Sequence, residues 1–196
     1  MFNSRFPNMT VVDEPVYKSE LFFGLGYMAG FYSQIQNSPT ITNTTTETSL
    51  IGVGVGTLAV PANTLQVGNA FIVRMGGFLS ALNNEPITIN LKSNGSILAT
   101  TGVISLNTTT NLIWQMDITF VVRGVGSAGA ASLENHFVFS YEENANDKFT
   151  SHAVDVVNNT TFDTGILNTL EITATWGNAI VGNSIYSTVF NLNKMY

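Results

Sequence analysis

The sequence predicts an all-β protein: an antiparallel two-sheet sandwich, built as a single jelly roll, with an extended N-terminal arm. Three observations predict this fold class. Apolar and polar residues alternate with a period of two in successive runs after residue 46. Clusters of Gly, Asn and Thr separate these runs, and no segment has a convincing helical period. About eight to ten short strands are expected from this spacing.

Residues 56–74 show the pattern on a small scale, with two strand-like runs on either side of a polar turn. The runs are Thr57–Val60 and Ala70–Arg74. Pro61 fixes φ and has no backbone N–H, so the first strand should end there. Gly68 can adopt the positive φ that leads the chain into the next strand.

Each later strand is expected to place its apolar residues on one face, as a sheet with one side on a core does. These apolar sets are Phe71, Val73 and Met75; Ile87, Ile89 and Leu91; Trp114, Met116, Ile118, Phe120 and Val122; Phe137, Phe139 and Tyr141; Leu170, Ile172, Ala174 and Trp176; and Tyr186, Thr188, Phe190 and Leu192. Among the turns, Asn94-Gly95 most clearly predicts a hairpin, because a type I′ turn needs positive φ at both central residues.

Residues 1–46 differ from the rest and are predicted to form an arm and linker, leaving residues 47–196 as the jelly-roll domain. The segment Leu21–Tyr32 is uncharged and rich in aromatics and glycine, and it is too short for the about 20 residues of a membrane span. It is either a strand or short helix packed on the sandwich, or an apolar arm that docks on a neighbouring subunit. The polar segment from Ser38 to Thr46 has the composition of a linker.

Charge is sparse, at 10% of residues, with 7 Lys and Arg against 13 Asp and Glu. Interface cores are depleted in charge, so much of the surface is expected to be covered by other subunits; a neutral glycan-binding face is the alternative. The cations are scattered singly, which argues against direct nucleic-acid binding and against an anionic membrane surface. They are Arg5, Lys18, Arg74, Lys92, Arg123, Lys148 and Lys194. The absence of cysteine excludes disulfides and Cys-based zinc sites.

Two patterns resemble functional motifs, but each has a simpler structural interpretation. Gly52, Gly54 and Gly56 form G-x-G-x-G. A phosphate site needs a helix directly afterwards, whereas here Pro61 and another strand follow, so close strand packing or a bulge is favoured. His136 and His152 lack the spacing of a metal-binding pair, and no cofactor or metal site is assigned.

One loop concentrates oxygen ligands suitable for calcium, although a solvated acidic loop is the favoured interpretation. Its residues are Glu142, Glu143, Asn144, Asn146 and Asp147. Glu142 and Glu143 should point to opposite faces, so they make a poor glycosidase pair. Tyr141, Trp176 and Tyr186 could stack on sugars, but core packing is favoured for each. No catalytic set is found, so the chain is predicted not to be an enzyme.

Several segments resemble one domain of virion proteins, found in tail, spike and capsid-associated proteins of bacteriophages and large DNA viruses. They are GTLAVPANTLQVGNAF (56–71), WQMDITFVVR (114–123), and LEITATW (170–176) followed by NSI (183–185). The resemblance covers roughly residues 47–192. It implies a β-sandwich that assembles at the virion surface, often as a trimer or pentamer, and it transfers no catalytic residue.

These observations together predict a structural virion protein, a single jelly-roll capsid or capsid-vertex subunit (penton or minor capsid protein). It is expected in the virion, as a homo-oligomer that contacts other capsid proteins through its N-terminal arm. The alternative is a module of a viral spike, fibre or tail that binds a host-surface glycan or receptor through loops between strands.

Overall fold

The computed structural model describes residues 29–144 and 148–195, which form thirteen strands and no helix. The larger sheet contains β1 (Ala29–Gln34), β2 (Ile41–Thr42), β4 (Gly54–Gly56), β6 (Ala70–Ala81), β9 (Thr109–Gly124), β10 (Ser132–Glu143), β11 (Lys148–Asn158) and β13 (Ser184–Lys194). The smaller sheet contains β3 (Thr48–Ser49), β5 (Ala59–Val60), β7 (Glu85–Ser93), β8 (Ser96–Leu106) and β12 (Asn168–Trp176).

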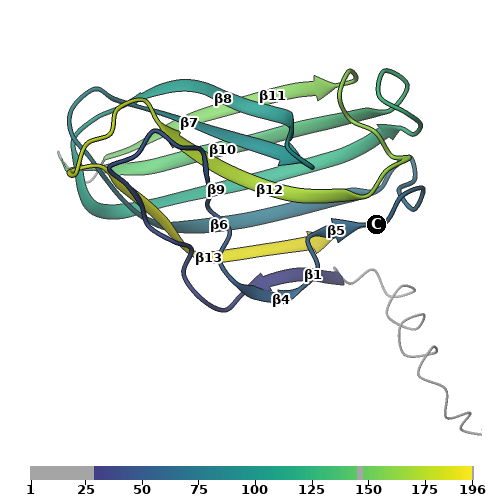
Figure 1. The fold of residues 1–196 in the computed structure, drawn as a ribbon, viewed down its shortest axis with the longest axis horizontal. Coiled ribbons are helices and arrows are strands. Elements are labelled where there is room, and N and C mark those ends of the chain that lie inside the picture. The colour runs from purple at the N-terminus through teal and green to yellow at the C-terminus, as the bar shows by residue number, and fades with distance from the viewer. Residues whose placement is uncertain (1–28, 145–147, 196) are drawn as a thin grey trace, which may run out of the picture.

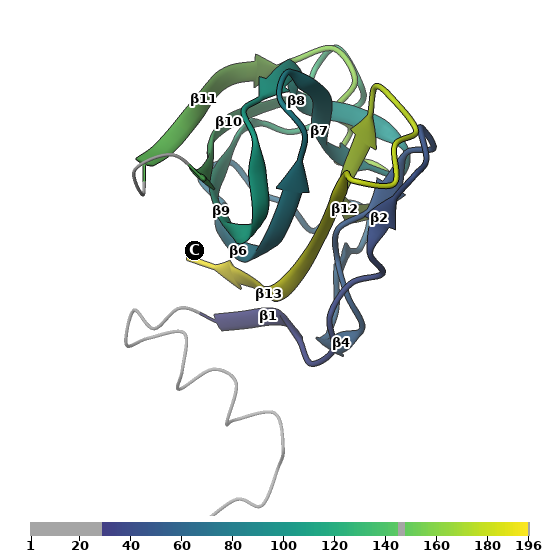
Figure 2. The same cartoon turned by 90° about the vertical axis from the view of Figure 1, so that its left-hand side faces the viewer.

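The two sheets are antiparallel and face each other across one apolar core (Figures 1 and 2). The strand order is β11-β10-β9-β6-β13-β1-β4 in the larger sheet and β3-β12-β7-β8 in the smaller. Hydrogen bonds join the two sheets at the end of β11. There the Asn158 side-chain amide donates to the carbonyls of Ile97 (3.2 Å) and Leu98 (3.3 Å) on β8. The predicted all-β, two-sheet antiparallel sandwich is therefore confirmed.

Eight of the strands are distributed between the two sheets in a regular order along the chain. If β1, β3, β6, β7, β8, β9, β12 and β13 are numbered 1 to 8 along the chain, the larger sheet contains the order 1-8-3-6 and the smaller sheet 2-7-4-5. The hairpin β10–β11 is inserted between the sixth and seventh of these strands. It extends the larger sheet beyond β9.

The core follows the predicted alternation in most strands. Trp114, Met116, Ile118 and Val122 are buried on one face of β9, and the predicted sets of β7, β10 and β12 are buried as well. The turn predictions also hold: β5 ends directly before Pro61, and Asn94 and Gly95 both have positive φ (48° and 78°). Local sequence therefore determines which way these side chains face.

For the last strand, β13, the prediction that Tyr186 and Thr188 face the core is wrong. Phe190 and Leu192 are buried, but Tyr186 lies on the outer face and is only partly buried. The cause is a β-bulge: Ser187 pairs with Gly77 and Val189 pairs with Gly76, so Thr188 is the extra residue. An extra residue reverses the facing of every side chain before it.

The predicted boundary at residue 47 lies too late in the chain. Strand β1 pairs with β13 and β4, and β2 pairs with β13. Ile41 is buried in the core, and its carbonyl accepts a hydrogen bond from the Trp176 indole (3.1 Å). The polar segment predicted as a linker is thus part of the sandwich. Of Leu21–Tyr32, only residues 29–32 are described and they form strand; the remainder of the predicted arm, residues 1–28, lies outside the described residues.

Candidate functional surfaces

A hollow of about 620 Å³ lies on the outer face of the larger sheet, over β6, β9 and the bulge of β13. Three cross-strand pairs of β6 and β9 line it: Phe78 with Ile113, Gly76 with Gln115, and Arg74 with Asp117. On the other side of Gly76, the half-exposed Val189 of β13 lines it as well. We call it the outer-sheet hollow. It therefore combines an apolar end, a centre with one polar and one apolar side chain, and a charged end.

Glycine and the neighbouring bulge explain why the sheet is hollowed here. Gly76 faces outward and has no side chain, and a Cβ built on it would lie 2.8 Å from the Trp114 carbonyl oxygen. The bulge turns Tyr186 to the outer face, where its ring packs on Phe78 with centroids 5.8 Å apart. Alternation along the strands does not predict this site. The only local signal was the pair Gly76-Gly77 inside a strand, since such glycines mark bulges or a close approach of a ligand.

The charged end of the hollow is open and electrically balanced. The Arg74 Nε lies 3.5 Å from Asp117 Oδ1, and the two side chains are 74% and 67% exposed. An exposed pair of this kind contributes little stability. It leaves donors of the guanidinium and an acceptor of the carboxylate available to a ligand.

A second surface is formed by three loops at one end of the sandwich, residues 61–69, 125–131 and 159–167, which we call the loop end. Backbone hydrogen bonds join the loops: Asn63 N–H to Thr164 O (2.8 Å) and Thr164 N–H to Gly126 O (2.9 Å). Asp163 is the only ionisable side chain in these ranges. Large apolar side chains are nevertheless exposed there, namely Val67, Val125, Ile166 and Leu167. An ordered, nearly uncharged surface with exposed apolar residues is typical of a protein interface.

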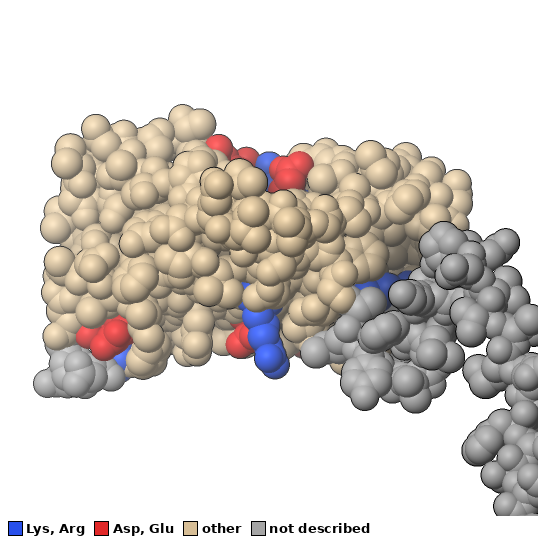
Figure 3. Space-filling view, turned by 90° about the horizontal axis from the view of Figure 1, so that it is seen from below, with Lys and Arg blue, Asp and Glu red and all other residues tan. Residues whose placement is uncertain are grey.

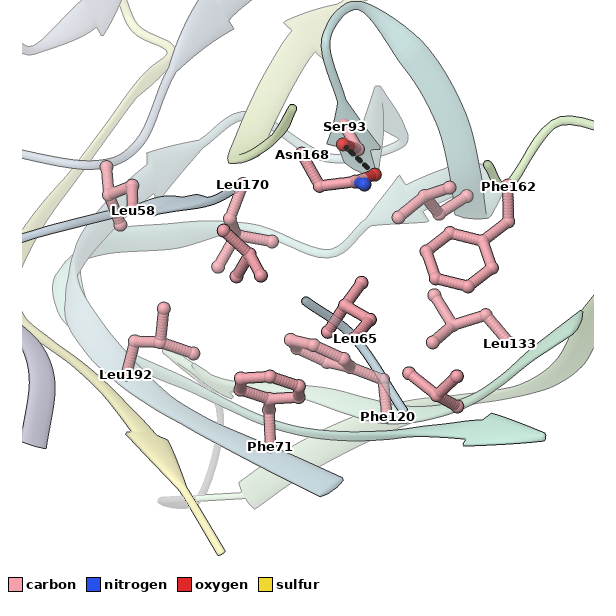
Figure 4. A pocket seen from close by; sticks show the side chains of 13 residues that line it. Leu58, Leu65, Phe71, Ser93, Phe120, Leu133, Phe162, Asn168, Leu170 and Leu192 are labelled. Carbon is pink, nitrogen blue, oxygen red and sulfur yellow. Dashed lines mark hydrogen bonds between the residues drawn. The ribbon is translucent and has the colours of Figure 1, made fainter. Parts of the chain in front are cut away.

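The interior cavity is a packing defect rather than a ligand site. It measures about 50 Å³ and is lined mainly by leucine, valine and phenylalanine side chains from both sheets (Figure 4). Its polar groups, Ser93 and Asn168, bond to each other at 2.9 Å. An apolar cavity stays dry, and this one is smaller than the engineered cavity of about 150 Å³ that binds benzene.

A polar cluster on the smaller sheet is centred on Glu47, and its buried Asn90 Oδ1 has no hydrogen-bond partner among the described residues. The Glu47 carboxylate accepts hydrogen bonds from Lys92 (2.9 Å), Thr173 (2.6 Å) and Asn90 (3.0 Å). These donors, Lys92 first, lower the pKa of Glu47 to about 2. The cluster links the start of β3 to β7 and β12, so we assign it a structural role.

The three glycines of G-x-G-x-G allow β4 to lie close against β1, which confirms the close-packing interpretation. A Cβ on Gly52, Gly54 or Gly56 would lie 2.1–2.3 Å from a backbone oxygen of residues 31–36. No side chain fits at such distances from backbone atoms. The glycine pattern is therefore explained by the pairing of two strands.

The two histidines are not brought together. His136 is exposed on the outer face of β10, whereas His152 on β11 points inward and stacks on Tyr141 with ring centroids 6.4 Å apart. Within residues 29–144 and 148–195, no three His, Asp or Glu side chains are grouped as metal ligands.

The candidate calcium loop is only partly described, because Asn146 and Asp147 lie outside the described residues. The Glu143 carboxylate accepts hydrogen bonds from Thr150 and from Asn107 (2.8 Å), and these donors, Thr150 first, hold its pKa below the ordinary value. The Asn144 side-chain oxygen accepts the Thr110 N–H (2.9 Å). These oxygens already have partners within the protein. The interpretation as a solvated acidic loop, rather than a calcium site, stays a prediction.

The three candidate sugar-stacking aromatics divide into two groups. Tyr141 and Trp176 are fully buried, so core packing is confirmed for both. Tyr186 is the exception, because the bulge places it on the outer face beside Phe78.

Acid is expected to weaken the fold through His152. Burial lowers the pKa of its imidazole, and its Nε2 atom is buried without a hydrogen-bond partner among the described residues. The folded state thus favours the neutral ring. The contribution of neutral His152 to the free energy of unfolding is fully present above about pH 6.5. It falls as the pH drops below that value, by at most about 1.4 kcal/mol per pH unit.

The check is urea unfolding at pH 7.5 and pH 5 for the wild type and for His152→Phe, whose ring can still stack on Tyr141. The loss of stability at pH 5 should be smaller in the variant. Identical pH profiles would show that His152 does not contribute.

A functional assignment for this chain rests on its fold and on these surfaces. No protein-family model matches the chain, and no curated protein shows significant similarity to it. In the part of the chain that the structure describes, no helix is long and apolar enough to cross a membrane.

Proposed function

We propose that this chain is a non-enzymatic structural protein of a virion, a single jelly-roll subunit of a capsid or capsid vertex. The observation that carries the proposal is the loop end, which exposes Val67, Val125, Ile166 and Leu167 on loops that hydrogen bonds hold in place. Exposed apolar residues on an ordered surface with almost no charge favour burial against another subunit.

The strand order supports the jelly-roll interpretation. A jelly roll consists of two Greek keys whose strands alternate between two sheets. The orders 1-8-3-6 and 2-7-4-5 have this character: the first and last strands are neighbours in one sheet, and the second and seventh are neighbours in the other. The hairpin β10–β11 is then an insertion at the edge of one sheet.

The distribution of charge supports assembly rather than nucleic-acid binding. The face shown in Figure 3 is nearly free of charge, with a few isolated acidic and basic side chains. Each described salt bridge pairs one cation with one carboxylate: Arg74 with Asp117, Lys92 with Glu47, and Arg123 with Glu134. No described basic side chains are clustered as a phosphate-binding surface requires.

The proposed partners are copies of the same chain and other capsid proteins. Identical subunits favour closed symmetry, and a trimer or pentamer is consistent with the virion resemblance. The N-terminal arm, whose residues 1–28 lie outside the described residues, is proposed to contact a neighbouring subunit.

The test is the solution mass of the full chain, measured by light scattering after size exclusion. The wild type should be an oligomer, and Leu167→Glu should shift it to monomer, because a buried unpaired charge opposes association. Val181→Glu is the matched control: Val181 is 79% exposed and lies in the loop 177–183, at the other end of the sandwich. A monomeric wild type, or oligomers equally stable in both variants, would contradict assembly through the loop end.

A further inference from the structure

The outer-sheet hollow has two features that regular sheets lack. A glycine, Gly76, removes a side chain from the middle of strand β6, and the bulge at Thr188 turns Tyr186 outward beside Phe78. Bulges often re-aim a side chain at a functional site. A strand glycine leaves room for a ligand or another backbone to approach closely, and at Gly76 the Trp114 carbonyl already does so.

The hollow also has the size of a small-ligand site. Its volume of about 620 Å³ lies within the about 300–1,000 Å³ that is usual for such sites. Its floor is a rigid part of the sheet, since β6 lies between β9 and β13 and pairs with both. A ligand would therefore meet a preformed surface and would order little of the protein on binding.

The groups around the hollow are arranged by polarity. The Phe78 ring, with Tyr186 packed beside it, and the half-exposed Ile113 form the apolar end. Gln115 is exposed at the centre, and the pair Arg74–Asp117 forms the other end. Together these side chains offer both hydrogen-bond donors and acceptors.

This arrangement matches two linked pyranose rings, because Arg74 lies four residues from Phe78 along β6, which is about 13 Å. One face of such a ring is made of C–H groups, which pack on an aromatic or aliphatic surface, and its edge carries hydroxyl groups that both donate and accept hydrogen bonds. The guanidinium, carboxylate and amide at the polar end supply matching groups.

The charge of the hollow defines the class of sugar. Arg74 and Asp117 cancel, so the site has no net charge to attract a phosphate, sulfate or sialic acid. A purely apolar partner would bury this ion pair and Gln115 without compensation, at a cost in free energy. We infer that the outer-sheet hollow binds a neutral oligosaccharide, with one ring against Phe78 and its hydroxyls on Gln115, and with the hydroxyls of the next ring on Arg74 and Asp117. This inference does not depend on the proposed assembly through the loop end.

The test uses the full chain, fluorescently labelled, on an array of neutral oligosaccharides and their sialylated counterparts, followed by calorimetric titration of the neutral sugar that binds best. The wild type should bind neutral sugars in preference to sialylated ones. Gln115→Ala and Phe78→Leu should each weaken binding by about tenfold, the loss expected for one good polar or stacking contact.

His136→Ala is the matched control, because His136 is exposed on the outer face of the same sheet but does not line the hollow. Its affinity should equal that of the wild type. Gln115 is exposed, so Gln115→Ala tests the site even if Phe78→Leu impairs folding, which thermal unfolding would reveal. The inference is overturned if no neutral oligosaccharide binds at up to about 10 mM, if sialylated sugars bind better, or if Gln115→Ala binds as the wild type does.

Discussion

Gly77→Ala is expected to lower the free energy of unfolding by about 3 kcal/mol, at the upper end of what overpacking of a core usually costs. A Cβ on Gly77 would lie 2.0 Å from the Tyr186 carbonyl oxygen and 2.7 Å from the Ser187 Cα. Both are backbone atoms of β13, which is held between β6 and β1. Relief therefore requires movement of a central strand rather than rotation of a side chain.

Urea unfolding followed by circular dichroism measures this loss, with Gly30→Ala as the control. Gly30 lies in β1, which also pairs with β13, but the nearest atom to its Cβ is the Asn193 side-chain oxygen at 3.9 Å. The control should unfold near the wild-type midpoint. If both variants unfold at the same urea concentration, the close approach of β6 to β13 is wrong.

Trp176→Ala is expected to cost about 4 kcal/mol, within the range for truncating a buried aromatic side chain. Trp176 is fully buried, and its indole N–H donates to the Ile41 carbonyl at 3.1 Å. The substitution leaves a large cavity between the sheets and removes the donor that holds β2. Chemical denaturation measures the loss.

Trp176→Phe separates packing from the hydrogen bond. It keeps an aromatic ring but leaves the Ile41 carbonyl without its donor, at a cost of about 1–3 kcal/mol. Amide hydrogen exchange around residues 38–42 should then be faster than in the wild type, while β7 and β12 keep their protection. Unchanged exchange at residues 38–42 would mean that the indole does not anchor this segment.

The sequence predicts best those strands in which alternation alone decides on which face of the sheet each side chain lies. Trp114 to Val122 is such a run: each side chain faces opposite to its neighbours, and the pairing of β9 introduces no irregularity within it. The last strand failed because its bulge depends on Gly76 and Gly77, which lie over a hundred positions earlier in the sequence. No property of residues 184–194 alone indicates where the facing changes.

Non-local contacts also explain the misplaced domain boundary. Ser38 to Thr46 is composed like a linker, yet the Ser187 N–H donates to the Ser38 hydroxyl (2.9 Å) and Ser38 N–H donates to the Ser187 carbonyl (3.0 Å). Similarly, the outer-sheet hollow combines residues of β6 and β9 with the bulge of β13. Alternation and turn residues predict the fold class, but these partners are set by tertiary pairing.

The central place of β13 has a consequence for the order of folding. This strand follows every other strand along the chain, yet it lies between β1 and β6 and pairs with both. During synthesis the larger sheet therefore stays incomplete, with unpaired edges on β6 and β1, until residues 184–194 leave the ribosome. Such long-range closure makes folding slow, and it separates in time the formation of β7–β8 and β9–β11 from the completion of the sheet. A subunit interrupted before β13 would expose strand edges that pair readily with other chains.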